Sequence, residues 1–236
     1  MLKIKSDGLS IYIRMSRESS PSSLFREAFE AARRIKNIVI FTAVLYAISF
    51  IAGCTLTSIG NSYASELEEE IQRYLLSQEI FAVILEYLRT GNLVAAILIT
   101  FTVNLCLGAF LTTTLPGILP LLGAIGISFV GLLRGFVVGL TYPQVLGYSP
   151  LAFIVGVGTI LLELGAYVLS SAAGVNISLA PVFPARYETE SRMTAFKEAW
   201  KDAARIFVIV IILLGLGAIW EMVGIYFLIQ PIQHPG

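Results

Sequence analysis

The sequence predicts an all-α fold: a polytopic integral membrane bundle of five transmembrane helices, with short amphipathic interfacial helices attached, in one domain over residues 1–236. Composition is the first observation behind this prediction. Of the 236 residues, 56% are hydrophobic and only 14% are charged, whereas a soluble domain averages about 25% charged residues. A water-soluble fold of this length could not hide so much apolar surface, so we expect lipid to surround most of the chain. The formal net charge of zero gives no overall basic field, and we expect no nucleic-acid partner.

Apolar runs of membrane-spanning length are the second observation. A spanning helix needs about 20 predominantly apolar residues, and five stretches qualify: 38–56, 93–113, 117–140, 151–171 and 207–230. The apolar region between residues 93 and 140 is too long for one helix. Its segment TTTLPGILP carries Pro116 and Pro120, which remove backbone donors and predict the turn between the second and third spans.

The distribution of basic residues predicts the orientation. Eight basic residues precede the first span and five lie between the fourth and fifth spans: Lys3, Lys5, Arg14, Arg17, Arg26, Arg33, Arg34 and Lys36, then Arg186, Arg192, Lys197, Lys201 and Arg205. By the positive-inside rule, the N-terminal tail (1–22) is cytoplasmic and the C-terminus is extracytoplasmic. An odd number of spans also requires the two ends to lie on opposite sides. We therefore expect a multi-pass protein of the cell membrane.

A repeated phrase precedes the first and fifth spans. LFREAFEAARRIK begins at Leu24 and AFKEAWKDAARIF begins at Ala195, an offset of 171 residues. We interpret the copies as interfacial helices over 23–36 and 194–205, with Ser23 and Thr194 as N-caps. Their expected aromatic anchors in the headgroup layer are Phe25, Phe29, Phe196 and Trp200. Convergent composition and internal duplication both remain open as the origin of the phrase.

The segment 62–90 between the first two spans reads as an extracytoplasmic helix. Ser65 and Glu68 form a capping-box pattern. An apolar stripe follows along Leu67, Ile71, Leu75, Ile80, Ile84 and Leu88. Either this helix folds over the bundle, or it docks an unidentified protein partner. Its EExxxR pattern resembles that of membrane-embedded CAAX-type proteases, but those enzymes also need intramembrane histidines and the only histidine here is the terminal His234.

Three charged residues fall inside predicted spans: Arg134, Glu163 and Glu221. Ionisable groups at membrane depth are expensive, and they usually face protein or water, commonly in pairs. The arginine could reach either carboxylate, which leaves one negative charge in excess. Either one carboxylate is protonated or the cluster holds a cation. Together with Asn104, an amide in the second span, these residues form the predicted intramembrane polar cluster, for which a helix-fixing ion pair and an ion or proton path are the alternatives.

Gly131, Gly135 and Gly139 repeat at four-residue intervals, and this doubled GxxxG stripe favours close helix packing in lipid. The stripe serves either packing within the chain or a homodimer. We find no nucleophile placed with a base, no glycine-rich phosphate loop and no metal-ligand spacing, so we expect neither enzymatic activity nor a cofactor. Cys54 and Cys106 sit at different depths, and we expect no disulfide.

Short motifs in the second to fourth spans resemble those of the stage II sporulation protein M family. They are FTVNLCLGAF, GLLRGFVVGL and TILLELGAYVLSSAAG. Phe101 and Asn104 match the family's F-x-x-N pattern and Glu163 matches its glutamate. Ala172, Ala173 and Gly174 match its small-residue stretch. Arg134 stands where the family has asparagine, and Thr159 and Ile160 stand where it has histidine and glycine, so the resemblance suggests that Arg134 and Glu163 compensate for one another. The resemblance implies five spans with a cytoplasmic N-terminus.

The leading functional hypothesis is a non-enzymatic scaffold or membrane-organising subunit, self-associated as a homodimer or bound to a partner. The alternative is a channel or transporter whose polar core is the intramembrane polar cluster. A third idea is lipid handling by the interfacial helices.

Overall fold

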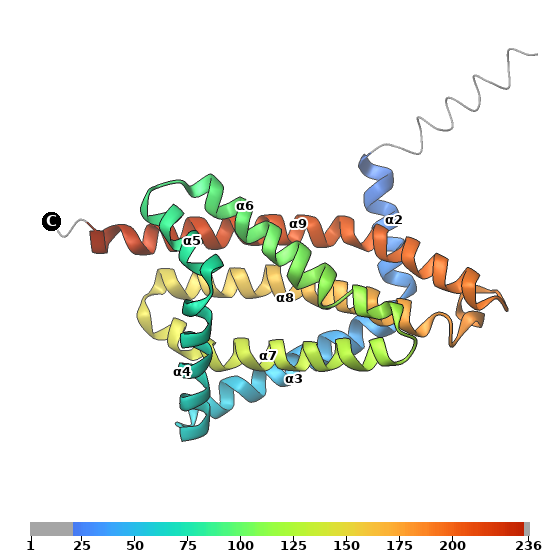
Figure 1. The fold of residues 1–236 in the computed structure, drawn as a ribbon, viewed down its shortest axis with the longest axis horizontal. Coiled ribbons are helices and arrows are strands. Elements are labelled where there is room, and N and C mark those ends of the chain that lie inside the picture. Colours follow the sequence, from blue (N-terminus) through green and yellow to red (C-terminus); the bar gives the residue numbers. More distant parts are fainter. Residues whose placement is uncertain (1–20, 234–236) are drawn as a thin grey trace, which may run out of the picture.

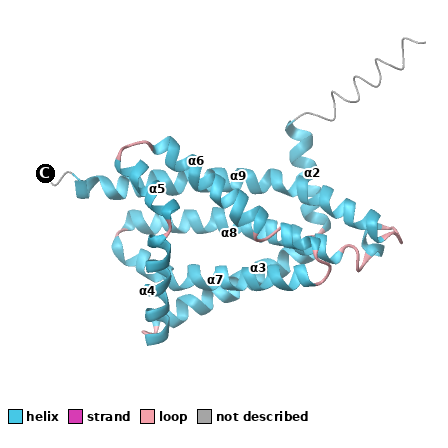
Figure 2. Ribbon diagram, viewed as in Figure 1, coloured by secondary structure: helices cyan, strands magenta, loops and turns pink. Residues whose placement is uncertain are grey.

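The computed structural model describes residues 21–233, without the side chains of residues 21, 143–148 and 229–233. Most of the predicted tail 1–22 and His234 therefore lie outside the described residues. The elements in chain order are α2 (Pro21–Arg34), α3 (Lys36–Ser58), α4 (Ser62–Ser77), α5 (Glu79–Arg89), α6 (Leu93–Val103), η1 (Asn104–Leu111), η2 (Leu115–Ile118), α7 (Leu122–Tyr148), α8 (Pro150–Leu179), η3 (Pro184–Tyr187) and α9 (Arg192–Gln233). All are helical, as Figure 2 shows.

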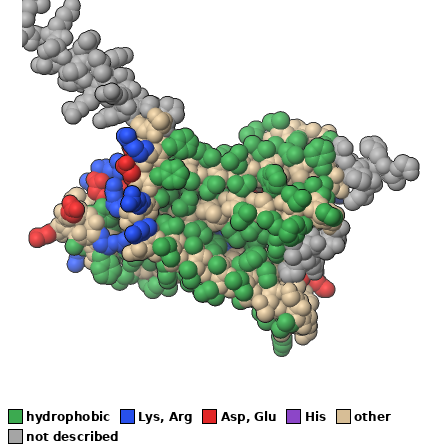
Figure 3. All heavy atoms as spheres, turned by 180° about the vertical axis from the view of Figure 1, so that it is seen from behind, with side chains coloured by type: hydrophobic (Ala, Val, Ile, Leu, Met, Phe, Trp, Pro, Cys, Tyr) green, Lys and Arg blue, Asp and Glu red, His purple; other side chains and the backbone are tan. Residues whose placement is uncertain are grey.

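Five helical segments are long and apolar enough to cross a membrane: Lys36–Ser58, Leu93–Ile118, Leu122–Tyr142, Pro150–Leu179 and Arg192–Leu228. They lie roughly side by side, and the two ends of the described chain fall at opposite ends of the bundle (Figure 1). The predicted all-α bundle with five spans is thereby confirmed. Which end faces the cytoplasm stays a prediction, and we call the end that carries α2, η3 and the start of α9 the basic end. Figure 3 shows basic side chains gathered there and hydrophobic side chains over the rest of that face.

The two copies of the repeated phrase adopt different structures. The first forms α2, which a break at Ile35 (φ −100°) separates from α3 and which runs across the bundle (Figure 1). The second is continuous with its span in the 42-residue α9, so the prediction of a separate interfacial helix over 194–205 is wrong. The hydroxyl of Ser191 accepts from the backbone N–H of Thr194 at 3.3 Å, and Ser191 rather than Thr194 is the N-cap. Nor is Ser23 an N-cap, because α2 already includes Pro21.

The predicted aromatic anchors separate in the same way. Phe25 and Phe29 on α2 are exposed, the latter by 64%. Phe196 and Trp200 on α9 are only partly exposed and pack against the hydrophobic core. Their rings meet edge to face at 6.4 Å. The α2 pair therefore remains available to lipid, whereas the α9 pair contributes to packing within the protein.

The segment 62–90 forms two helices rather than one. Gln78 adopts an extended conformation (ψ 126°) and ends α4, and α5 begins at the next residue. The N-cap of α4 is Asn61, whose side chain accepts from Ala64 N–H at 3.2 Å, so the predicted cap at Ser65 is wrong. Ile84 and Leu88 on α5 are buried as expected, but Leu67 and Leu75 on α4 are exposed.

The spans differ from the predicted bounds at the basic end. Residues Leu115–Ile118 form the short 3-10 helix η2 in the turn, and α7 begins at Leu122 rather than at 117. Helix α8 continues to Leu179, two turns past the predicted end. Its small residues allow this extension to be buried: Gly174 approaches the turn so closely that an added Cβ would meet Thr114 Cα at 2.9 Å.

The glycine stripe of α7 packs against α3. A Cβ at Gly131 would lie 2.9 Å from the ring of Tyr46, and one at Gly135 would collide with Ser49. Gly139 packs against the backbone of Phe50. Gly53 of α3 is equally close to α7, since a Cβ added there would lie 2.8 Å from Leu140 N. Of the two alternatives for the stripe, the structure adopts packing within the chain.

Candidate functional site

A cavity of about 630 Å³ opens between four spanning helices and the α4–α5 pair. All four residues of the predicted intramembrane polar cluster line it: Asn104, Arg134, Glu163 and Glu221. They come from η1, α7, α8 and α9. A second cavity of about 370 Å³ shares Arg134, Glu163 and Glu221 and runs between α7, α8 and α9. Polar residues from four separate parts of the chain thus line one cavity at membrane depth.

Asn104 and Glu163 bind one another directly. The amide Nδ2 of Asn104 donates to Glu163 Oε1 at 2.7 Å. Asn104 opens the π-helical turn η1, which interrupts the regular helix of the second span. Turns of π-helix are rare in proteins overall, and those that do occur are often at functional sites. A hydrogen bond thus joins the F-x-x-N asparagine to the glutamate of the resembling motifs.

Arg134 is held by groups other than the two carboxylates. Its guanidinium lies over the ring of Tyr167 at 3.9 Å, donates to Thr112 Oγ1 at 3.2 Å and approaches Gly108 O at 3.5 Å. Among the described residues it forms no ion pair with Glu163 or Glu221, so the expected direct pairing is not found. The stacked Tyr167, which the sequence reasoning missed, fits only because residue 108 is glycine: a Cβ there would lie 2.8 Å from the ring.

Glu221 faces the cavity without a partner. Among the described residues no hydrogen bond or ion pair reaches its carboxylate, although it lines both cavities. The buried hydroxyl of Thr159, in the second cavity, also has no hydrogen-bond partner in the described part of the chain. Unpaired polar groups in a dry interior cost free energy. These two groups therefore mark the part of the cavity where the protein leaves polar capacity unused.

Helices α4 and α5 form one wall of the cavity. Apolar side chains from both helices line it, including Leu76, Ile80, Phe81 and Leu85. Ile84 and Leu88 anchor α5 in a small hydrophobic cluster with Met222 of α9. The cavity thus has an apolar cover above a polar floor.

A cluster of buried hydroxyl groups lies beyond the cavity, toward the basic end. Thr113 and Ser170 share a hydrogen bond at 2.8 Å, and Tyr46 and Ser171 share one at 3.3 Å. All four side chains are buried. Because Thr113 follows Thr112, which binds Arg134, the hydroxyl groups adjoin the polar floor of the cavity.

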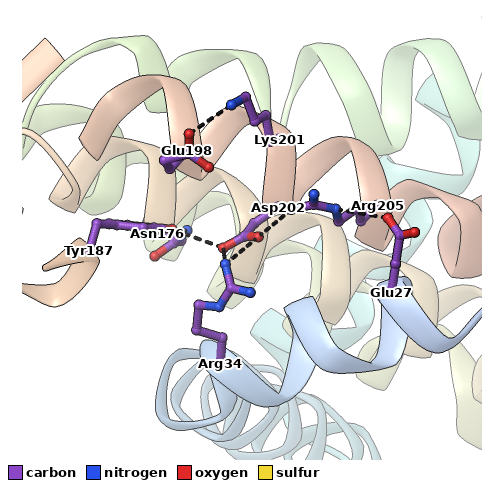
Figure 4. Close-up of polar contacts among 8 residues, drawn as sticks. All are labelled: Glu27, Arg34, Asn176, Tyr187, Glu198, Lys201, Asp202 and Arg205. Atoms are coloured by element: carbon purple, nitrogen blue, oxygen red, sulfur yellow. Dashed lines mark hydrogen bonds and ion pairs between the residues drawn. The ribbon is translucent and has the colours of Figure 1, made fainter. Parts of the chain in front are cut away.

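A second polar network occupies the basic end, where α2 crosses α9 (Figure 4). Its centre is Asp202, which is fully buried. Arg34 of α2 donates to its two carboxylate oxygens at 2.9 and 3.1 Å, and Arg205 donates at 3.3 Å. Arg205 also pairs with Glu27 at 3.3 Å. These bonds join the two copies of the repeated phrase.

Tyr187 and Asn176 complete this basic-end network. The Tyr187 hydroxyl donates to Asp202 Oδ2 at 3.2 Å and accepts from Asn176 Nδ2 at 2.6 Å. Burial raises the pKa of Tyr187 to about 12, and the Asp202 charge acts in the same direction. The sequence reasoning missed Asp202, although one signal was present: Asp202 aligns with Ala31, where the copies differ in charge.

The groups around the cavity are charged or hydrogen-bonding side chains, which can bind charge. Among the described residues no group of three or more His, Cys, Asp or Glu side chains is placed to hold a metal ion. Two carboxylates and one guanidinium in the cavity can accommodate one further positive charge. The basic-end network holds its charges in ion pairs.

Comparison with known proteins identifies the family. The family model described as Stage II sporulation protein M matches residues 10–223, a region that includes both polar networks. No curated protein matches the chain, and no solved structure matches it. Because the match covers most of the sequence, this multi-pass membrane protein belongs to the stage II sporulation protein M family.

Proposed function

We propose that this protein is a non-enzymatic membrane protein that takes up a positive charge, a proton or a small cation, in its intramembrane cavity and passes it across the bilayer. The observation that carries the proposal is Glu221, a carboxylate at membrane depth that lines the cavity without a hydrogen-bond or ion-pair partner among the described residues. Ionisable groups in that position are functional candidates by default.

The charge balance of the cavity supports a cationic occupant. Arg134 contributes one positive charge and the two glutamates contribute two negative charges when ionised. The guanidinium is occupied by Tyr167, Thr112 and Gly108, and Glu163 is bound by Asn104. Glu221 is therefore the group best able to bind and release a proton or cation.

The decisive experiment measures flux in proteoliposomes. We expect liposomes that contain the protein to take up protons or potassium ions down an imposed gradient faster than protein-free liposomes do. The variant Glu221→Gln should abolish this uptake. Glu86→Gln is the matched control, because Glu86 is exposed on α5 and does not line the cavity. Gel filtration checks that each variant stays folded. Absence of flux from the wild-type protein under every gradient would remove the proposal.

A scaffold role is the second candidate, and exposed side chains of α4 favour it. The exposed fractions are 81% for Tyr63, 64% for Tyr74 and 68% for Leu76. These side chains suit contact between α4 and a membrane-associated protein partner. A photo-crosslinking amino acid in place of Tyr74 should then give one discrete protein adduct in native membranes. The control is the same group in place of Leu161, a 70% exposed residue in the middle of α8 that should meet lipid. Adducts only with lipid at both positions, together with a strictly monomeric protein in detergent, would count against this role.

We also propose that the basic end faces the cytoplasm, as the positive-inside rule predicts. Cysteines introduced near residues 68 and 195 should react with an impermeant reagent from opposite sides of the membrane.

A further inference from the structure

An apolar groove of about 790 Å³ lies at the basic end, on the outside of the bundle. It runs between the beginnings of α3 and α7 and the end of α8, with Arg186 of η3 at its rim. It shares no lining residue with either intramembrane cavity. Its occupant is therefore a separate question from the proposed transport.

The groove has an apolar trough and a polar rim. Phe41, Ile125, Phe129 and Leu132 line the trough, and all four are exposed to the surroundings. The α7 residues recur at intervals of four and three, so they lie along one helical face. At 1.5 Å per residue, the stretch 125–132 extends the trough by about 10 Å along the spanning direction.

The polar rim is formed by Asn37 and Arg186. Both side chains are exposed, and neither makes a hydrogen bond or ion pair with another described residue. Arg186 differs in this respect from Arg34 and Arg205 of the same end, whose charges are matched by acids of the chain. Its guanidinium is thus an unmatched positive charge where the apolar trough begins.

We propose that this groove binds one anionic phospholipid, with the phosphate at Arg186 and Asn37 and an acyl chain along Phe41 and the exposed face of α7. Charge complementarity supports this occupant, because a guanidinium pairs strongly with phosphate. The position of the rim supports it too, because basic residues bordering a span lie at headgroup level. An apolar trough that leads into the membrane from such a rim fits a lipid better than a soluble anion.

Lipid retention in detergent, measured by native mass spectrometry, tests the proposal. The protein is purified with equal amounts of phosphatidylglycerol and phosphatidylcholine, which differ in net charge. We expect the wild-type protein to retain one phosphatidylglycerol in preference to phosphatidylcholine. Arg186→Gln should reduce that preference about fivefold, the factor expected for one basic residue near an anionic headgroup.

Two further variants give the experiment its specificity. Lys197→Gln removes the same charge from an exposed residue at the same end that does not line the groove, and it should leave the preference within about twofold of wild type. Ile125→Trp fills the trough without changing charge and should reduce retention of both lipids.

Three outcomes would overturn the proposal. Equal retention of the two lipids by the wild-type protein would show that the rim does not select charge. An equal loss in Lys197→Gln would assign the preference to the basic surface in general. Displacement of the lipid by millimolar glycerol phosphate would show that a soluble phosphate is the ligand. Ion flux does not enter any of these results, so they are independent of the proposed transport.

Discussion

The docking of α2 on α9 depends on a buried carboxylate, and its two partners should respond unequally to mutation. Arg34→Met retains most of the side-chain stem but removes both bonds to Asp202, of 2.9 and 3.1 Å. Asp202 is fully buried, whereas Arg34 is 49% exposed. Removing the arginine leaves a buried anion with fewer donors, while removing the anion leaves a cation that water can reach.

The expected magnitudes follow from this difference. Breaking a buried ion pair from one side costs about 3–5 kcal/mol, but the half-exposed Arg34 and the remaining donors, Arg205 and Tyr187, reduce this. We expect Arg34→Met to weaken the docking of α2 by about 2–3 kcal/mol. Asp202→Asn should cost only about 1–2 kcal/mol because the arginines become solvated. The double variant should cost less than the sum by about 1 kcal/mol.

Amide hydrogen exchange of α2 in lipid nanodiscs measures this docking directly. A loss of about 2–3 kcal/mol corresponds to roughly 30- to 150-fold faster exchange through local opening. Arg26→Met is the matched control, because Arg26 is highly exposed and pairs only with the neighbouring Glu30 among the described residues. Unchanged exchange in Arg34→Met, or strict additivity in the double variant, would refute the inferred role of the buried charge.

Three further predictions concern packing, the cavity and pH. Gly139→Ala should lower stability by about 1–3 kcal/mol because the added Cβ would strike the backbone of α3. Gly126→Ala is the control: an added Cβ there has nothing within 4 Å, so stability should be unchanged or higher. Equal melting temperatures of the two variants would contradict the tight α3–α7 contact. Asn104→Leu should cost about 0.6–2 kcal/mol in an SDS unfolding titration because Glu163 loses its donor, and no cost would mean that the bond contributes nothing. The pKa of Tyr187 is raised to about 12 in the folded protein, from about 10 in the unfolded chain. The free energy of unfolding should therefore fall as the pH rises from about 10 toward 12, and Tyr187→Phe should lessen this fall. An equal pH dependence in both proteins would exclude Tyr187 as its cause.

The candidate cavity was predictable in its members but not in its bonds. Arg134, Glu163 and Glu221 stand out in the sequence because charge is rare inside apolar runs. The arginine was expected to reach a carboxylate, since opposite charges at similar depth attract. In the structure a glycine at 108 makes room for the Tyr167 ring beneath the guanidinium. No property of residues 108 or 167 alone signals that contact.

Asp202 is the opposite case, a buried charged residue that the sequence did not single out. It lies in an amphipathic phrase rich in charge, where an aspartate normally faces water. It is buried because distant segments meet around it: Arg34 of α2, 168 residues earlier, and Tyr187 of η3 both donate to its carboxylate. The break at Ile35 that turns α2 across the bundle is equally invisible in the repeated phrase, since the second copy continues straight into its span.

The sequence by itself determined the solvent, the number of spans and the family, because apolar length and short motifs are properties of contiguous residues. Only the tertiary structure decided which faces meet: the glycine stripe on α3 rather than on a second chain, Glu221 open to a cavity, and Asp202 buried among α2, α9 and η3. The physical reason is that lipid accepts any apolar face alike, so the choice among faces depends on close packing and on pairing of polar groups between distant segments.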